Sequence, residues 1–229
     1  MISESSTTED YEEGEIPAPS IPSGMSFSDP QKGVHRVMIV GDSQIASVEK
    51  NIRDGTRHFS NLMDLEQCEI YWMAHPEADL EWVRDIVLST VSVCKPNIVF
   101  LHLGINDIAK GQSPTEVLQK FVLLTQVLLE NDHVKHVLIG QAVWVDSPKA
   151  CEISQVFGLN QKLTSRFHRP ARSTPFHDKT TFVRYIQVMN LTRKELKLSQ
   201  TGELSPETAI ALYDGIRLAL MKVMKEVAV

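Results

Sequence analysis

Two apolar segments of the chain each end in a glycine that is followed by polar side chains. Residues 37–40 lead into Gly41-Asp42-Ser43, and residues 97–103 lead into Gly104-Ile105-Asn106-Asp107. Ligands of an open parallel sheet bind beyond the carboxyl ends of its strands, so these turns are expected to place a serine hydroxyl beside an asparagine amide. A nucleophile facing N–H donors for a developing oxyanion is what acyl transfer requires. The spacing therefore predicts part of an acyl-transfer site.

Each polar residue of these turns also has a purely structural alternative. Ser43 begins a predicted helix, where its hydroxyl meets free backbone N–H groups but also serves as a helix cap. Asp42 is expected to cap that helix or a neighbouring loop rather than to react, and Asp107 is expected to cap the turn that follows the second segment. Asn106 either donates to an oxyanion or bridges two loops.

Strands and helices alternate from Val34 onward. Hydrophobic periodicity predicts strands at residues 35–41, 68–73, 97–103, 137–143 and 182–188, and helices at 43–53, near 78–93, from 113, near 150–167 and from 205. Ser113-Pro114-Thr115-Glu116 indicates a helix start with a capping box and a proline in the first turn. Near-continuous apolar strands indicate a parallel sheet covered on both faces. Right-handed crossovers then predict a three-layer α/β domain.

In this frame the two turns resemble the first and third sequence blocks of the SGNH (GDSL-type) hydrolase superfamily. The order of the blocks, their strand contexts and the separation between them carry the resemblance, which covers about residues 35–226. It implies a flavodoxin-like α/β/α sandwich with a five-stranded parallel sheet. It also implies that Ser43 occupies the nucleophile position and Asn106 an oxyanion-hole position. In style the blocks are similar to esterase-like domains of retroelement and related eukaryotic or viral open reading frames.

The block that supplies the general base in this superfamily is missing. The superfamily has a histidine just ahead of the final helix, with an aspartate three residues before it, yet no Asp-x-x-His occurs in the 229 residues. With Leu204-Ser205-Pro206 matched to the stretch after that histidine, Glu203 takes the histidine position and Gln200 the aspartate position. The second block lacks its glycine as well, because the chain runs Ala74-His75-Pro76-Glu77 there, and proline has no N–H to donate.

A serine hydroxyl is a poor nucleophile until a base takes its proton. Positioned general-base catalysis contributes about 10²–10⁴-fold, and a triad that loses one member keeps only a residual of about 10³–10⁴ over water. We therefore interpret the chain as a catalytically defective domain that is used for binding. The alternative is an O-acyl esterase that uses Ser43 with Glu203 or His75 as an unusual base. His102 lies inside a predicted strand and is expected to be a hydrogen-bonded core residue.

The net charge of -6 is unevenly distributed. Residues 1–33 contain seven acidic residues and only one basic residue, which leaves 22 of each sign in residues 34–229. A neutral domain lacks the electrostatic field typical of nucleic-acid binders. The leader is rich in Ser, Thr, Glu, Pro and Gly, so we expect it to be disordered, and its acidity is one route to a protein partner.

The most basic patch of the domain spans residues 166–179. It combines Arg166, Arg169 and Arg172 with an interleaved aromatic residue, Phe167. Such a patch suits phosphate and base-stacking contacts, so an RNA-binding module is a third interpretation. A solvated loop is the simpler one, because the domain as a whole is neutral.

Several further classes of protein are not indicated by the sequence. Cys68, Cys94 and Cys151 have no metal-ligand spacing and are expected to be reduced, buried thiols. No signal peptide precedes the domain and no apolar stretch reaches the length of a membrane span, so a cytoplasmic or nuclear location is expected rather than secretion. Without a Walker loop, a dinucleotide fingerprint or a metal-ligand cluster, no cofactor or metal is expected.

Overall fold

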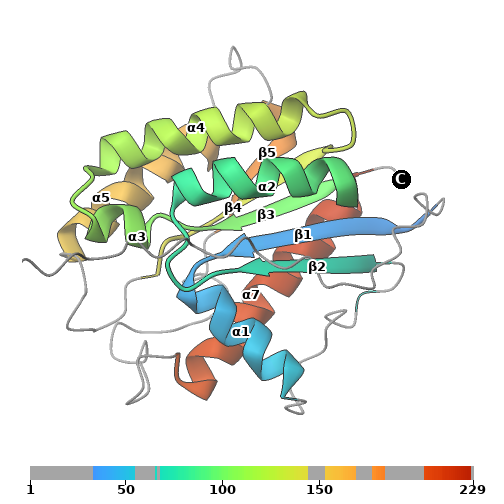
Figure 1. The fold of residues 1–229 in the computed structure, drawn as a ribbon, viewed down its shortest axis with the longest axis horizontal. Helices are drawn as coiled ribbons and strands as arrows, with labels where there is room; N and C mark the ends of the chain where they lie inside the picture. Colours follow the sequence, from blue (N-terminus) through green and yellow to red (C-terminus); the bar gives the residue numbers. More distant parts are fainter. Residues whose placement is uncertain are drawn as a thin grey trace, which may run out of the picture.

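A computed structural model of the chain describes residues 33–54, 65, 68–143, 153–168, 177–183 and 204–227. Five parallel strands form one sheet in the order β2-β1-β3-β4-β5 (Figure 1). The strands are β1 (His35–Gly41), β2 (Cys68–Ala74), β3 (Ile98–His102), β4 (His136–Gly140) and β5 (Thr180–Val183). The predicted five-stranded parallel sheet is confirmed.

Helices cover both faces of the sheet. They are α1 (Ser43–Arg53), α2 (Leu80–Cys94), α3 (Ile105–Ala109), α4 (Pro114–Glu130), α5 (Ile153–Leu163) and α7 (Pro206–Met224), with a π-helix at Thr164–His168 and a 3-10 turn at His177–Lys179. α2, α4 and α5 lie on one face, and α1 and α7 pack together on the other (Figure 1). The domain is therefore a three-layer α/β/α sandwich, as the pattern of apolar segments predicted.

The buried side chains form one core on each side of the sheet. In β1, Met38 and Val40 join the core under α2, α4 and α5, whereas Val37 and Ile39 join the core under α1 and α7. All four side chains are fully buried. Because both faces of a strand are covered, nearly every residue in it must be apolar, which explains the continuous apolar runs in the sequence.

The register of the sheet brings the two glycine-ended strands together. Gly41 pairs with Ala74 of β2 on one side and with His102 of β3 on the other. The segments that follow β1, β2 and β3 therefore leave the sheet at the same edge. This edge is where the sequence placed the candidate site.

Helix starts were predicted closely, and some strand ends were not. Ser113 forms the expected capping box at α4, and Ser205 caps α7. β4 ends at Gly140 rather than at residue 143, because the Asn160 side chain of α5 bonds both the N–H and the carbonyl of Ala142. β5 begins at Thr180, two residues earlier than predicted, and residues 184–200 lie outside the described part.

Two of the three cysteines lie in the described part of the chain. Cys68 and Cys94 are buried free thiols, as expected. Cys151 and residues 1–32 of the predicted leader lie outside the described residues. In the part of the chain that the structure describes, no helix is both long and apolar enough to cross a membrane.

Candidate functional site

Ser43 is the first residue of α1 and is exposed to solvent. The helix is capped by Asp42, whose Oδ1 accepts from the Gln44 N–H at 3.0 Å. The predicted capping role of Asp42 is confirmed, and Ser43 is not the cap. Among the described residues, no hydrogen bond involves the Ser43 hydroxyl. The hydroxyl is therefore available to a ligand but has no base beside it in this part of the chain.

Gly41 allows α1 to start immediately after β1. A Cβ at this position would lie 2.1 Å from Ile45 Cγ1 and 3.0 Å from the His102 carbonyl oxygen. No side chain fits between the strand end and the first turn of the helix. The glycine of the first motif is thus required by the packing that presents Ser43.

Asn106 lies in the short helix α3, directly after the positive-φ residue Gly104. Its Nδ2 donates to the Pro76 carbonyl at 3.1 Å and to the Ala78 carbonyl at 2.9 Å. An amide nitrogen has two hydrogens, so both are used within the protein. Of the two alternatives in the sequence, the structure shows the loop bridge, and the oxyanion-side donor is engaged.

The connection from β2 to α2 is held in a similar way. The His75 N–H donates to the Gly41 carbonyl at 3.1 Å, and the Glu77 N–H donates to Nδ1 of the His75 ring at 3.3 Å. The same ring stacks on Trp82 with a centroid distance of 5.3 Å. His75 therefore lies at the predicted edge of the sheet, but its ring is held by the Glu77 N–H and by Trp82 of α2.

His102 is a buried structural residue, as predicted. Its Nε2 is 2.8 Å from Gln44 Oε1, while Gln44 Nε2 donates to the Val143 carbonyl at 2.7 Å. A carbonyl can only accept, so the Gln44 amide nitrogen faces Val143 and the His102 Nε2 is the donor to Gln44. Burial lowers the pKa of His102 to about 3, so the ring is neutral.

Gln44 is a residue that the sequence analysis missed. It is buried and links the first turn of α1 to β3 and to the segment after β4. Its position one helical turn before the buried Val48 was a usable signal, since residues four apart share a helix face. A polar residue on that face needs partners in the core.

Asp107 does not cap the turn after β3, which corrects the prediction. Its Oδ2 accepts instead from the N–H of Leu80, the first residue of α2, at 3.1 Å, while the N-cap of that helix is Asp79. The side chain is fully buried, and Lys120 Nζ lies 3.7 Å from Oδ1. With Asn106 bonded to the loop before α2 and Lys110 paired with Asp79, α3 is fastened to the start of α2.

The two turns each contain a buried acid. Asp42 is 1% exposed and Asp107 is fully buried, and one carboxylate oxygen of each has no hydrogen-bond partner in the described part of the chain. Burial raises the pKa of Asp42 to about 7, and the nearby Asp107 charge adds to the effect. Burial also raises the pKa of Asp107 to about 6. The edge of the sheet therefore contains two carboxyl groups that lose their protons only at a higher pH than an ordinary aspartate does.

The predicted base position and most of the basic patch, including Glu203, Arg169 and Arg172, lie outside the described residues. Leu204, next in sequence to Glu203, is buried, and its N–H donates to the Ser47 hydroxyl at 3.4 Å. The chain thus re-enters the described part against α1, one helical turn from Ser43.

The part of the basic patch that is described does not form a stacking surface. Arg166 is partly exposed in the π-helix. Phe167 is only 9% exposed and packs in the core under α2, α4 and α5. The RNA-binding alternative required this ring for base stacking, but the ring completes the hydrophobic core.

Comparison with known proteins finds similarity in structure only. No family model matches the sequence, and no curated protein matches it. Solved structures match across most of both chains. A protein of Bacteroides fragilis assigned as an acylhydrolase is 16% identical, with a TM-score of 0.66 and coverage of 87% of this chain and 92% of that one.

Two further matches are a lipase/acylhydrolase from Enterococcus faecalis and a carbohydrate esterase family 3 enzyme from Talaromyces cellulolyticus. Each is 15% identical, with TM-scores of 0.60 and 0.58. The first match covers 83% of this chain and 97% of its own, and the second covers 85% and 100%. A GDSL-like lipase from Bacteroides thetaiotaomicron also matches. The strand order, the two glycine-ended turns and these matches agree, and the chain has the fold of the SGNH, or GDSL-type, hydrolases.

Proposed function

We propose that the chain is a catalytically defective SGNH-hydrolase-like domain that acts as a binding or interaction module. One observation carries the proposal, namely that the Asn106 amide, which the resemblance assigns to the oxyanion hole, is engaged. It donates to two loop carbonyls. A substrate oxyanion would have to take this donor away from acceptors in the protein.

The magnitudes support a loss of turnover. Each hydrogen bond that Asn106 gives up costs about 0.5–1.5 kcal/mol net, and one oxyanion-hole donor contributes about 3–4 kcal/mol to catalysis. Giving up one of these bonds therefore offsets at most about half of the catalytic contribution of Asn106. The absence of the Asp-x-x-His block removes a further factor of about 10²–10⁴.

The described histidines near this edge do not supply the missing base. His102 is neutral and buried, and its Nε2 proton is directed at Gln44. His75 is stacked on Trp82, with Nδ1 already accepting a hydrogen bond. What remains is an exposed serine at the edge of the sheet where ligands of this fold class bind, which suits recognition without turnover.

Active-site labelling tests the proposal directly. The full chain is incubated with a fluorophosphonate probe and, separately, with a short-chain acyl ester, alongside a Ser43→Ala variant. We expect no labelling and no hydrolysis above the Ser43→Ala background. Labelling of the parent chain that disappears in Ser43→Ala would overturn the proposal.

The second candidate function is an O-acyl esterase with Glu203 as the base. It is favoured by the contact of Leu204 with Ser47, because the residue beside Glu203 reaches the helix that begins with Ser43. If labelling is found, Glu203→Gln and His75→Gln separate the two candidate bases. Loss of labelling in only one of them identifies the base.

The remaining predictions concern partners and location. The acidic leader of residues 1–33 is proposed as a disordered segment that can engage a protein partner, in a cytoplasmic or nuclear protein. RNA binding through residues 166–179 is not favoured, because Phe167 is buried. Salt-sensitive RNA binding that is lost in an Arg169→Glu, Arg172→Glu double variant would reverse that judgement.

A further inference from the structure

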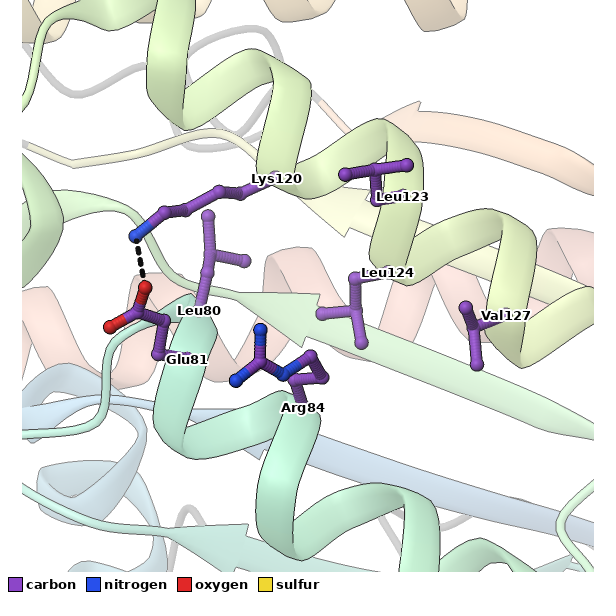
Figure 2. A pocket seen from close by; sticks show the side chains of 7 residues that line it. All are labelled: Leu80, Glu81, Arg84, Lys120, Leu123, Leu124 and Val127. Atoms are coloured by element: carbon purple, nitrogen blue, oxygen red, sulfur yellow. Dashed lines mark hydrogen bonds and ion pairs between the residues drawn. The ribbon is translucent and has the colours of Figure 1, made fainter.

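An apolar groove lies between α2 and α4, on the outer surface of one helical layer (Figure 2). It has a volume of about 90 Å³, and leucines from both helices line it. Lys120 reaches across the groove from α4 to Glu81 of α2, with 3.2 Å between Nζ and Oε1 (Figure 2). Leu123 and Val127 project from α4 along the same side.

These two apolar side chains are exposed where a surface helix is normally polar. Leu123 is 63% exposed and Val127 is 42% exposed. They occupy the centre of a stripe formed by Glu116, Lys120, Leu123, Val127 and Glu130. The steps of four, three, four and three residues are those of a coiled-coil seam. The outer face of α4 therefore has the residue spacing of a helix that packs against a second helix in a coiled coil.

We propose that this seam, together with the groove beside it, is the contact between two copies of the chain packed antiparallel through α4. With the two-fold axis at the level of residue 125, Leu123 of one copy faces Val127 of the other, and Lys120 faces Glu130. Apolar residues then meet apolar residues, and each charge meets its opposite. A parallel pair would place Lys120 against Lys120, so only the antiparallel arrangement is self-complementary.

The same patch supplies both a projection and a recess, which a two-fold interface requires because both copies use identical surfaces. Leu123 is the projection, and the groove between α2 and α4 is the recess. Glu130 is exposed and accepts a hydrogen bond only from Gln126 within its own helix among the described residues, so it can pair across the interface without losing a tertiary contact. The Lys120 ammonium group would be shared between that Glu130 and Glu81 of its own copy.

The charges around the groove argue against a strongly charged occupant. Arg84 pairs with Asp85, and Lys120 pairs with Glu81, so cations and anions are balanced there. An acidic or basic partner would meet as much repulsion as attraction. A second copy of α4, which carries one lysine and one glutamate at matching distances from the axis, fits this balance.

The interface is expected to be weak. Two apolar residues from each copy make a short seam, and stable interfaces bury at least about 1,000 Å² in total. We therefore expect association in the micromolar range or weaker, visible as a sedimentation coefficient that rises with protein concentration. Sedimentation velocity of the full chain over a wide concentration range measures this directly.

Leu123→Asp is the decisive variant, and Leu218→Asp is its matched control. Leu218 is also exposed, at 47%, but lies on α7 in the opposite layer. Because each dimer loses two apolar contacts and gains two charges, we expect Leu123→Asp to weaken dimerisation roughly a hundredfold. Leu218→Asp should dimerise like the parent chain. Equal effects of the two substitutions would overturn the proposal.

A charge exchange tests the antiparallel geometry. Lys120→Glu and Glu130→Lys should each weaken their own homodimer, since both place like charges opposite each other. An equimolar mixture of the two variants should dimerise again, because each pair of positions 120 and 130 then joins a glutamate to a lysine, one pair with its original signs and the other with its signs exchanged. A mixture that stays monomeric contradicts the arrangement. If Lys120→Glu fails to fold, because Lys120 lies near buried Asp107, the two leucine variants decide.

Two other outcomes would also overturn the proposal. If the parent chain sediments as a monomer at every concentration, it does not associate with a second copy of itself. If it is a monomer and Leu123→Asp makes residues 1–32 more sensitive to a protease than Leu218→Asp does, the chain's own leader occupies the groove instead.

Discussion

The turn after β1 and the turn after β3 look alike in sequence but use their polar side chains differently. Both begin with a glycine that packing requires, and both contain a buried aspartate. After β1, the central polar residue, Ser43, is exposed and has no hydrogen-bond partner for its hydroxyl among the described residues. After β3, Asn106 donates both amide hydrogens to carbonyl groups in the connection to α2. One turn presents a group to solvent, and the other builds the framework.

The difference shows why a motif does not establish an activity. Catalysis needs donors aimed at the position of a developing charge and not already satisfied. Asn106 is an asparagine at the position that the resemblance assigns to the oxyanion hole. Its two amide hydrogens, however, already bond carbonyl groups of the protein. The hydrogen bonds that hold Asn106 in place therefore also use up its donors.

Gly41→Ala is expected to have the largest effect and to test what the two turns share. The added Cβ would overlap Ile45 Cγ1 at 2.1 Å, so α1 must move relative to β1. We expect a loss of about 3 kcal/mol in the free energy of unfolding, measured by chemical denaturation. Gly111→Ala is the control, because Gly111 has a positive φ and nothing lies within 4 Å of its Cβ position. A smaller loss for Gly41→Ala than for Gly111→Ala would show that crowding is not the reason for a glycine at position 41.

The two buried acids should make stability depend on pH. The pKa of Asp42 is raised to about 7 in the folded chain from an ordinary value of 3.8. Between these values the folded state binds more protons than the unfolded state, so the contribution of Asp42 to stability is fully present below the lower value and is lost as pH rises to the upper one. We expect a decrease on the order of a few kcal/mol from Asp42 alone.

Asp42→Asn isolates this contribution, because the amide keeps the cap and cannot ionise. Denaturation of the parent chain and of the variant at pH about 5 and pH about 8 should show a smaller difference for the variant. Asp107→Asn should act in the same direction over a lower range, since the pKa of Asp107 is raised to about 6. An unchanged pH dependence in both variants would contradict the inferred protonation.

Asn106→Ala should show that the turn after β3 depends on its polar side chain for stability, unlike the turn after β1. The variant leaves the carbonyls of Pro76 and Ala78 without their donor, which is expected to cost about 1–3 kcal/mol of stability. Thermal or chemical unfolding measures the loss. Because Asn106→Ser keeps a polar group too short to span both contacts, its stability should fall between those of the parent and of Asn106→Ala. A neutral effect would mean that the amide is not part of the framework.

Ser43→Ala should have the smallest effect on stability. The residue is exposed and is not the helix cap, so the change in the free energy of unfolding is expected to stay within about 0.5 kcal/mol. The contrast with Asn106→Ala is the sharpest form of the comparison. A loss of more than about 1 kcal/mol would reveal a structural contact of the serine.

Local patterns in the sequence predicted much of the fold. The bounds of β1 and α1 and the starts of α4 and α7 were predicted because they depend on neighbouring residues, such as Asp42, Ser113 and Ser205, that cap helix ends. The end of β4 was placed too late, because it depends on Asn160 from a later helix. Local propensity contains no information about a partner that arrives from elsewhere in the chain.

The candidate site divides in the same way. The positions of Ser43 and Asn106 at one edge of the sheet followed from the strand pattern and a rule of parallel sheets. The partners of Asn106 and Asp107 could not be deduced, because they lie 27 to 30 residues away in the loop before α2 and at its first residue. Gln44 is a stronger example, since the Val143 carbonyl that holds it is 99 residues away.

The sequence by itself determined which residues line the edge of the sheet, because side-chain pattern and glycine placement act over short stretches of chain. Only the tertiary structure decided that Ser43 is exposed while Asn106 is engaged. The physical reason is that a hydrogen-bond donor is satisfied by whichever acceptor packing brings within about 3 Å, and packing joins segments that are distant in sequence.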